Sequence, residues 1–479
     1  MKERYTKVFK EEMILVYALV KWLLLSVTAG VVVGAAAALF LFLLDYSIGE
    51  VQALSMWRLL LLPPGILLSS WLIRKLAPNA AGHGTEKVIE AVHNNSGRIK
   101  LAVVPVKLVA TVITLASGGS AGKEGPCAQI GAGLTSTMAT ILRFNDTDRK
   151  KLVVCGISAG FSAIFGTPVA GAIFGLEVLF IGQIFYDVML PSFVSGIVAF
   201  QTAGLLGVKY GAHTMVQVPH MNITTIMWVL GAGLFCGLAS MVFIEILGLT
   251  QRLSGMLKMG PNRKALLGGS ILAVLALVFG TRYLGLGLST IEHAAQGVPV
   301  PLYAFLLKSL FTGITLSFGG SGGIVTPTFF VGATSGFTFA TLFGLDPSFF
   351  SVIGFAAVLA GAANTPIAAT IMATEMFGSG ITSYAAAACI VAFAVSGHRS
   401  VYPSQILARP KSPIFRLTGI DLPVDQSESE MELGQSIIPS MMSSFDGFWK
   451  RRAFYTRDQH PDGPGETDDD YTKGGKDDS

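Results

Sequence analysis

The chain has 479 residues, of which 51% are hydrophobic and only 13% are charged, and its mean hydropathy is +0.60. Soluble domains carry roughly 25% charged residues, so this composition excludes an ordinary soluble protein and indicates a chain that lies mostly inside a bilayer. The formal net charge of +4 is too small to indicate a nucleic-acid partner. We therefore expect an all-α, multi-pass membrane protein whose main non-protein partner is the lipid bilayer.

Apolar stretches recur along the chain and predict its helices. A helix needs about 20 apolar residues to cross the hydrocarbon core, and several stretches are shorter than this or are interrupted by glycine and proline. Many tilted and broken helices are therefore expected. The stretches lie at about 13–47, 53–76, 101–117, 152–165, 168–208, 223–250, 265–287, 301–318, 347–361 and 366–396.

These stretches divide the chain into two halves. We predict a first half at 15–210, a linker at 211–222 and a second half at 223–410. An N-terminal segment (1–14) and a C-terminal tail (411–479) flank the halves. The far end of the tail is polar and acidic, which predicts that most of the tail is disordered.

Basic residues gather at both ends of the chain and predict its orientation. By the positive-inside rule both termini should be cytoplasmic, in a protein of the cell membrane. The first apolar run is too long and begins too late for a cleavable signal peptide. The basic residues are Lys2, Arg4, Lys7 and Lys10 before the first span, and Lys450, Arg451, Arg452 and Arg457 after the last.

The cysteines give no sign of a metal or redox site. All 4 lie in apolar sequence without CxxC spacing, which favours buried small side chains over disulfides or metal ligands. We expect neither a metal nor a cofactor. The residues are Cys127, Cys155, Cys236 and Cys389.

One glycine-rich element occurs twice and shows that the chain is duplicated. The pattern Gly-Gly-Ser-x-Gly-x-x-x-Pro-x-x-x-x-Gly-Ala fits 118–132 and again 319–333, with every matched pair 201 positions apart. A second motif, Thr-Pro-x-Ala, leads to Glu177 and recurs before Glu375, 198 positions later. Each half therefore starts a helix after a glycine-rich break.

The duplicated helix starts predict an anion-binding site. Irregular backbone at membrane depth is tolerated only where it is buried in protein or lines a watery cavity, and helix starts present free N–H groups and a positive dipole end. Two such starts meeting near the midplane are typical of transporters of anionic substrates. The alternative is that the small residues serve only helix packing, which does not account for the recurring serine and proline. The supporting turn residues are Gly122, Pro126, Gly322, Gly323 and Pro327.

Glu124 distinguishes the first copy of the element from the second. A carboxylate at the start of an embedded helix occupies the place that a small anion would take, so it should compete with the anion and leave when protonated. Ionisable residues inside a membrane are functional by default. The alternative is a helix-dipole cap paired with Lys123 or Lys107. We predict that Glu124 gates the anion pathway, which means that its side chain blocks or opens it.

Two enzyme motifs are matched only in part. Both copies fit GxSxG, but a nucleophile elbow follows a strand and needs histidine and acid partners, whereas an apolar helix precedes each copy here. An intramembrane serine hydrolase using Ser120 or Ser321 is therefore a remote alternative. Gly122-Lys123 ends like a P-loop, but Ser117 replaces its first glycine and Glu124 replaces the residue that holds magnesium.

A further rival function is cation transport. It would use Glu124, Glu177 and Glu375, and it predicts carboxylates instead of backbone amides along the pathway.

These motifs resemble the CLC family of chloride channels and proton-coupled chloride exchangers. The segment 104–131 is similar to the family's G(K/R)EGP region. The segment 322–327 resembles its GxFxP region, with Val325 where phenylalanine is usual, and 406–409 resembles the end of its final short helix. The resemblance covers about 15–410. It implies an inverted repeat, a homodimer with one pathway per subunit, and transport of chloride or a similar small anion, while the tail is too short for the paired regulatory (CBS) domains.

The resemblance also assigns roles to individual residues. Glu124 would be the external gating glutamate, the backbone amides around Glu124 and Gly125 would form an outer anion site, and those of Ile324 and Val325 would hold the central anion.

Two further positions of the resemblance concern the central site. Tyr402 is the nearest candidate for the family's central tyrosine. His83 stands where a selectivity serine would donate a hydroxyl, so a histidine N–H, or the hydroxyl of Thr85, would replace it.

The resemblance also has implications for proton transport and for the choice of anion. The family's internal proton-transfer glutamate follows the position of Glu177, and here that residue is Val178, as in the channel members. Glu124 and Glu177 remain the candidates for a proton path. The sequence favours channel-like passive conduction, with proton-coupled antiport as the alternative, and Pro126 argues against the fluoride-exporting branch.

Overall fold

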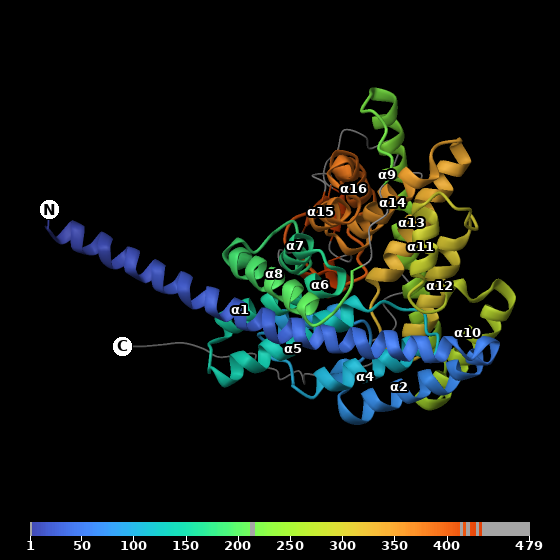
Figure 1. Cartoon of the computed structure of the whole chain (residues 1–479), viewed down its shortest axis with the longest axis horizontal. Coiled ribbons are helices and arrows are strands. Elements are labelled where there is room, and N and C mark those ends of the chain that lie inside the picture. Colours follow the sequence, from blue (N-terminus) through green and yellow to red (C-terminus); the bar gives the residue numbers. More distant parts are fainter. Residues whose placement is uncertain (1, 211–215, 412–414, 418–421, 428–430, 434–479) are drawn as a thin grey trace, which may run out of the picture.

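The computed structural model describes residues 2–210, 216–411, 415–417, 422–427 and 431–433. Part of the predicted linker and most of the tail, whose disorder was predicted, therefore lie outside the described residues. Figure 1 shows the described helices gathered into one body, with the N-terminal end of the first helix projecting beyond it.

Helices make up both halves. The first half contains α1 (Lys2–Gln52), α2 (Leu62–Leu76), α3 (Gly84–Asn94), α4 (Val103–Ala116), α5 (Glu124–Ile141), α6 (Asp146–Phe165), α7 (Pro168–Glu177) and α8 (Met189–Leu205). The second contains α9 (Ile223–Met256), α10 (Pro261–Phe279), α11 (Leu288–Ala295), α12 (Ala304–Ser317), α13 (Val325–Phe343), α14 (Pro347–Ala363), α15 (Pro366–Phe377) and α16 (Thr382–Val395). Short 3₁₀ turns join them: η1 (Ser55–Leu61), η2 (Pro78–Ala80), η3 (Tyr186–Val188), η4 (Thr281–Tyr283) and η5 (Ser379–Ile381).

The two halves repeat one packing scheme, which confirms the predicted duplication and the all-helical class. In the first half α5 packs on α6, α4 on α5, and α1 on α8. In the second half the corresponding pairs are α13 with α14, α12 with α13, and α9 with α16. The helix α7 also packs against its counterpart α15, so the halves meet along equivalent elements.

Equivalent helices of the two halves begin and end at matched residues. The helices α7 and α15 both begin at the proline of the Thr-Pro motif, where a missing N–H leaves no helical hydrogen bond unmade. The preceding helices end in left-handed residues, Gly166 with φ 73° and Asn364 with φ 59°. Glycine and asparagine adopt this conformation more readily than other residues, so the sequence itself ends α6 and α14 at equivalent points.

Within the described residues, 5 helical segments are long and apolar enough to cross a membrane. The remaining apolar helices, including α4, α7, α12 and α15, are shorter, as predicted for broken helices. The five segments are Phe9–Gln52, Met56–Leu76, Tyr186–Leu205, Ile223–Met256 and Pro261–Phe279.

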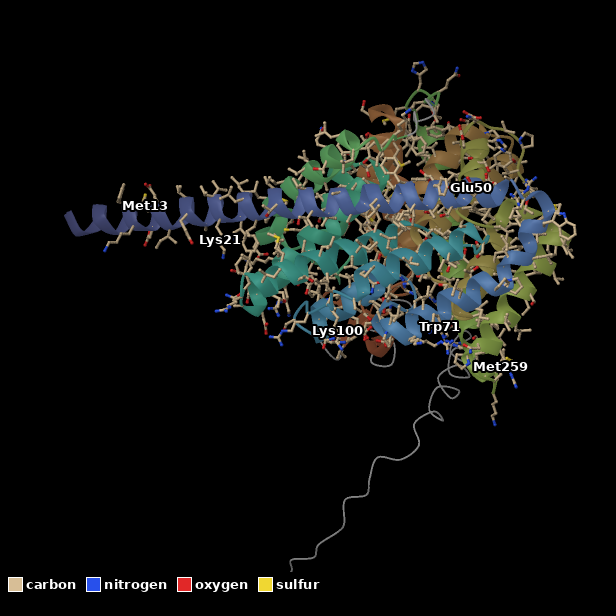
Figure 2. All side chains as sticks on the ribbon, turned by 60° about the horizontal axis from the view of Figure 1, so that its bottom comes forward. Met13, Lys21, Glu50, Trp71, Lys100 and Met259 are labelled. Atoms are coloured by element: carbon tan, nitrogen blue, oxygen red, sulfur yellow. The ribbon has the colours of Figure 1, made fainter. Side chains whose placement is uncertain are left out.

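The helix α1 is longer than predicted. It begins at Lys2 and runs for 51 residues, so residues 2–14 continue into the first apolar stretch as one helix. Its lysine and glutamate residues are good helix formers, which is why the polar start does not end the helix. Figure 2 places Met13 on the projecting end and Glu50 at the opposite end of α1.

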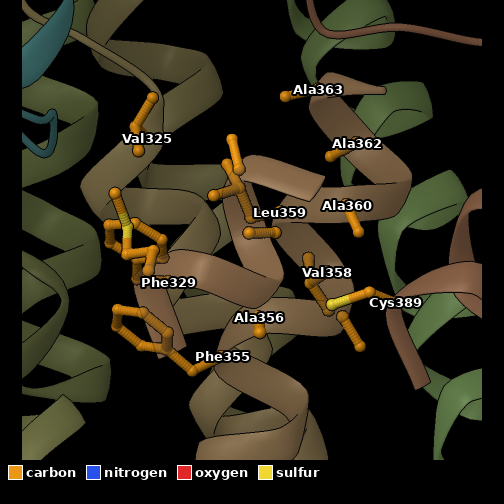
Figure 3. Close-up of a cluster of buried hydrophobic side chains, with 14 of the residues drawn as sticks. Val325, Phe329, Phe355, Ala356, Val358, Leu359, Ala360, Ala362, Ala363 and Cys389 are labelled. Atoms are coloured by element: carbon orange, nitrogen blue, oxygen red, sulfur yellow. The ribbon is translucent and has the colours of Figure 1, made fainter. Parts of the chain in front are cut away.

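The core is densest where α13 packs against α14. The rings of Phe329 and Phe355 stack with centroids 3.9 Å apart and planes 8° apart (Figure 3). A Cβ atom at Gly332 would lie 2.4 Å from the Gly354 carbonyl oxygen, and one at Gly131 would lie 2.2 Å from that of Gly156. Gly131 and Gly332, the last glycines of the two copies of the repeated element, therefore serve helix packing, because two helix backbones touch at each of them.

A small sheet follows the last helix. Strand β1 (Phe180–Ile181) pairs in parallel with β2 (Ile406–Leu407), and β2 pairs antiparallel with β4 (Leu422–Pro423). Within the segment 406–409, which was expected to end a short helix, Ile406 and Leu407 therefore form a strand, because they pair with β1. The short helix α17 (Val424–Ser427) follows β4 directly. Strand β3 (Phe415–Leu417) pairs antiparallel with β5 (Met431–Leu433).

Candidate anion-binding site

The N-terminal ends of α5 and α13 meet inside the protein. Gly122 N–H donates to the Gly323 carbonyl at 2.7 Å, and Gly323 N–H donates to the Gly122 carbonyl at 2.6 Å. A Cβ atom at Gly323 would lie 2.7 Å from the Gly125 nitrogen. Only glycine allows the two glycine-rich breaks to approach this closely, so the duplicated element brings two helix starts together, as the sequence indicated.

The carboxylate of Glu124 lies at the start of α13. Its Oε2 accepts the backbone N–H of Thr326 at 3.1 Å, and its Oε1 accepts the Thr326 hydroxyl. The side chain is fully buried. A carboxylate in the first turn of a helix is stabilised by free N–H groups and by the helix dipole, so Glu124 occupies a position that a small anion could take.

Thr326 was not identified from the sequence. The resemblance implied that the amides of Ile324 and Val325 hold the anion, and these residues lie at this helix start and are about 1% exposed. The amide that bonds the carboxylate is the next one along. The signal was present, because Thr326 directly precedes the recurring Pro327 and offers a hydroxyl beside its amide.

The start of α3 approaches the same place. His83 bridges to Gly322 as in a parallel pair of strands, and a Cβ atom at Gly84 would lie 2.3 Å from the Gly125 carbonyl oxygen. The ring of His83 lies 5.9 Å from the ring of Tyr402. Residues from four distant parts of the sequence therefore surround one point.

Buried polar atoms without partners mark this point. Among the described residues, His83 Nδ1, Thr85 Oγ1 and Tyr402 Oη are buried and have no hydrogen-bond partner. Buried polar atoms are nearly always hydrogen-bonded to protein, water or an ion. The cluster can therefore bind an anion or water through two hydroxyls and an imidazole, which brings together three of the predicted residues.

The turn that carries Tyr402 is fixed by Gln405. The Tyr402 N–H donates to the Ser400 hydroxyl at 2.9 Å, and that hydroxyl donates to Gln405 Oε1. Gln405 Nε2 donates to the carbonyls of Val178 at 2.8 Å and Ala363 at 2.9 Å. The buried side-chain amide of Gln405 thus connects the Tyr402 turn to the C-terminal ends of α7 and α14.

The two motif serines bond across the halves. The hydroxyl of Ser120 lies 3.1 Å from that of Thr312, and the hydroxyl of Ser321 lies 3.0 Å from that of Thr111. A serine nucleophile needs a basic partner such as histidine, and each of these serines has a threonine instead. Their geometry supports a structural role and gives no support to the hydrolase.

Two buried lysines occupy matched positions, 201 apart. Lys107 Nζ donates to the carbonyls of Ala80 at 3.0 Å and Gly82 at 2.6 Å. Lys308 Nζ donates to those of Tyr283 at 3.1 Å and Gly285 at 2.8 Å. Lys107 therefore holds the backbone that leads into α3, and its hydrogen bonds do not go to Glu124.

Glu177 and Glu375 bond to each other's half of the protein. The Glu177 carboxylate accepts the N–H groups of Ile367 at 3.1 Å and Ala368 at 2.8 Å, in the first turn of α15. The Glu375 carboxylate accepts those of Val169 at 3.1 Å and Ala170 at 2.8 Å in α7. Both carboxylates cap a helix, which gives no support to a cation pathway lined by them.

Comparisons with known proteins match nearly the whole chain. The family model described as "Voltage gated chloride channel" matches residues 65–397. A "Chloride/fluoride channel protein" of Pseudomonas syringae pv. tomato is 36% identical over 88% of this chain and 95% of its own length. A "Voltage-gated ClC-type chloride channel ClcB" of Shigella flexneri is 28% identical over 79% of this chain and 90% of its own.

Solved structures show the same fold. A "CLC-type fluoride/proton antiporter" is 29% identical, covers 81% of this chain and 98% of its own, and superposes with a TM-score of 0.77. A "slow cyanobacterial Cl-/H+ antiporter" superposes with a TM-score of 0.69 at 20% identity, covering 78% of this chain and 94% of its own.

These comparisons correct one expectation from the sequence. Channel-like conduction is not supported, because the similar solved structures are described as antiporters. The argument from Pro126 against the fluoride-exporting branch stays a prediction, while fluoride is named in a relative and in a solved structure. The matched family model, the relatives and the shared fold agree, and the chain belongs to the CLC family of voltage-gated chloride channels and anion transporters.

Proposed function

We propose that this protein exchanges a small monovalent anion for protons across a membrane, with Glu124 as the gate. The observation that carries the proposal is the Glu124 carboxylate held at the start of α13 by the amide and hydroxyl of Thr326. That contact is one that a free anion would make, so the side chain and the anion compete for one place.

Proton coupling follows from the same competition. An ionised Glu124 binds the helix start, whereas a protonated Glu124 loses its charge and with it most of its attraction to the positive end of α13. Anion entry and proton uptake by Glu124 then promote each other. The similarity to a structure described as a fluoride/proton antiporter supports exchange over passive conduction.

The proposed substrate is chloride or fluoride. The Pseudomonas syringae relative is named for both anions. The site around His83, Thr85 and Tyr402 offers two hydroxyls and an imidazole, which suit either anion.

The proposal is tested on the protein reconstituted in liposomes, with an anion electrode and a pH electrode in the same vessel. We expect a chloride or fluoride gradient to drive proton movement in the wild type. Glu124→Gln should abolish proton movement while the anion still passes, because an amide cannot carry a proton. Glu50→Gln, at an exposed position on α1, is the control and should change neither flux.

Two results would overturn the proposal. Wild-type liposomes that release no anion would exclude the transport function itself. Anion and proton fluxes that are both unchanged in Glu124→Gln would exclude Glu124 as the gate.

The proposed setting is the cell membrane, with both termini in the cytoplasm and two subunits that each contain a pathway. The clusters of basic residues at both ends support the orientation.

A further inference from the structure

The exchange proposed above requires a route for protons to reach Glu124, and the position expected for the second carboxylate holds Val178. Val178 is fully buried, and its carbonyl is bonded to Gln405. Both carboxylate oxygens of the neighbouring Glu177 accept backbone N–H groups of α15. Val178 has no ionisable side chain, and a proton on Glu177 would weaken a bond that caps α15.

We propose that Glu86, on the first turn of α3, is the carboxylate that exchanges protons between Glu124 and the aqueous phase on the Tyr402 side of the protein. This inference rests on the proposed exchange and adds a residue that the resemblance does not assign.

Glu86 is held in place by one oxygen and leaves the other free. Its Oε1 accepts the backbone N–H of Ser404 at 3.0 Å and the Ser404 hydroxyl at 2.5 Å. Its Oε2 is buried and has no partner among the described residues. A positioned carboxylate with one unused oxygen can bind a proton there without disturbing its contact to Ser404.

Unpartnered polar atoms continue from Glu86 toward Glu124. Thr85 Oγ1 and Tyr402 Oη are both buried without a hydrogen-bond partner, and the ring of Tyr402 lies 5.9 Å from that of His83, which precedes Glu86 on the same segment. Thr85 Oγ1 would lie 3.3 Å from a Cβ atom at Gly125, the residue after Glu124. Hydroxyls, together with water bound between them, are the groups through which a proton passes in a buried site.

Glu86 is also accessible from the surface. Its side chain is partly exposed, and Pro403, next to its partner Ser404, is exposed. The helix α3 is not one of the apolar segments long enough to cross a membrane. Burial raises the pKa of Glu86 to about 7, against the opposing effect of the Ser404 hydrogen bonds and Lys87, so the group both binds and releases protons near neutral pH.

The charges around Glu86 come from several elements. On α3 itself Lys87 favours the ionised form, and Glu90 opposes it. From the adjoining turn, the N–H and the hydroxyl of Ser404 bond its Oε1. Lys107 on α4 acts on neighbouring His83.

The proposed step is a proton transfer that balances without any other reactant. The O–H bond of protonated Glu86 breaks, an O–H bond forms on the Glu124 carboxylate, and the negative charge moves from Glu124 to Glu86. Glu124 then releases α13, and Glu86 recovers a proton from the adjoining aqueous phase.

The experiment compares proton uptake and anion flux in liposomes for the wild type, Glu86→Gln and Glu50→Gln. We expect Glu86→Gln to lower proton uptake by at least about tenfold, with anion flux retained. Glu86→Asp, which keeps a carboxylate, should restore part of the uptake. Glu50→Gln is the control, because it also replaces a glutamate by glutamine but lies at an exposed position on α1, and it should leave coupling unchanged.

The outcomes separate this inference from the proposed function. Anion flux without proton uptake in the wild type would refute both. Two results would refute the role of Glu86 but leave the proposed function standing. One is proton uptake that is as fast in folded Glu86→Gln as in the wild type, and the other is an equal loss of proton uptake and anion flux in Glu86→Gln. If Glu86→Gln does not fold, Ser404→Ala is used, and proton uptake that is not slower there also counts against the role.

Discussion

At the scale of single residues, Thr326 holds the Glu124 carboxylate at the start of α13. Its amide and hydroxyl both bond the Glu124 carboxylate, and a hydrogen bond to a charged group contributes about 1.5–3 kcal/mol. A substitution can remove the hydroxyl and leave the backbone amide in place. The contribution of the hydroxyl to holding Glu124 can therefore be measured separately from that of the helix start.

We therefore expect Thr326→Val to weaken the hold on Glu124 and to favour the competing anion. A loss of about 1.4 kcal/mol corresponds to a roughly tenfold lower half-saturating anion concentration. Flux measured against anion concentration in liposomes tests this. Thr328→Val is the control, because the Thr328 hydroxyl bonds the Ile324 carbonyl at 2.7 Å, and an unchanged value in Thr326→Val contradicts the prediction.

At the scale of helices, the capping carboxylates connect α7 with α15. Each of Glu177 and Glu375 satisfies two N–H groups that a helix start leaves free. The symmetry of these contacts provides an internal comparison, because only Glu177 lies beside the position of the family's proton-transfer residue.

If both carboxylates only cap helices, Glu177→Gln and Glu375→Gln should lower stability by similar amounts. We expect about 1–3 kcal/mol each, since an amide accepts through one atom where the carboxylate accepts through two. Thermal unfolding in detergent measures the loss, and the liposome assay should show normal proton coupling. Coupling lost in Glu177→Gln alone would assign Glu177 to the proton path.

The helix starts were more predictable than the contacts that hold them. Glycine, proline and the duplicated spacing predicted where α5 and α13 begin, because these residues restrict the backbone locally. Lys308 and Thr326 were missed as bonding residues, and Lys107 was considered only as a partner of Glu124, although the two lysines share the repeat spacing. An isolated polar residue in an apolar helix does not reveal which distant carbonyl or carboxylate it bonds, since this depends on how the halves pack.

At the scale of the whole molecule, neither half is complete without the other. Ser120 and Ser321 each bond a threonine of the opposite half, and the α7 and α15 starts are each capped by a carboxylate from the opposite half. Buried polar groups left without these partners would destabilise a separate half inside a membrane.

Two co-expressed fragments, divided between residues 207 and 222, should therefore assemble, co-purify and transport anion. Each fragment alone should aggregate or be degraded. Affinity purification through a tag on one fragment measures the assembly, and the same fragments carrying both Glu177→Ala and Glu375→Ala should co-purify less. Equal recovery with and without the capping carboxylates would show that apolar contacts alone join the halves.

The reciprocal capping of α7 and α15 also bears on ancestry. A protein made of one such half could satisfy its helix start only with a second copy of itself, as a two-fold symmetric pair. Both glycine-rich helix starts in that pair would have the same sequence, so a carboxylate gained by one would appear in the other. Within a single chain the two starts can differ, as they do here, where Glu124 stands in one copy and Val325 at the matched position of the other.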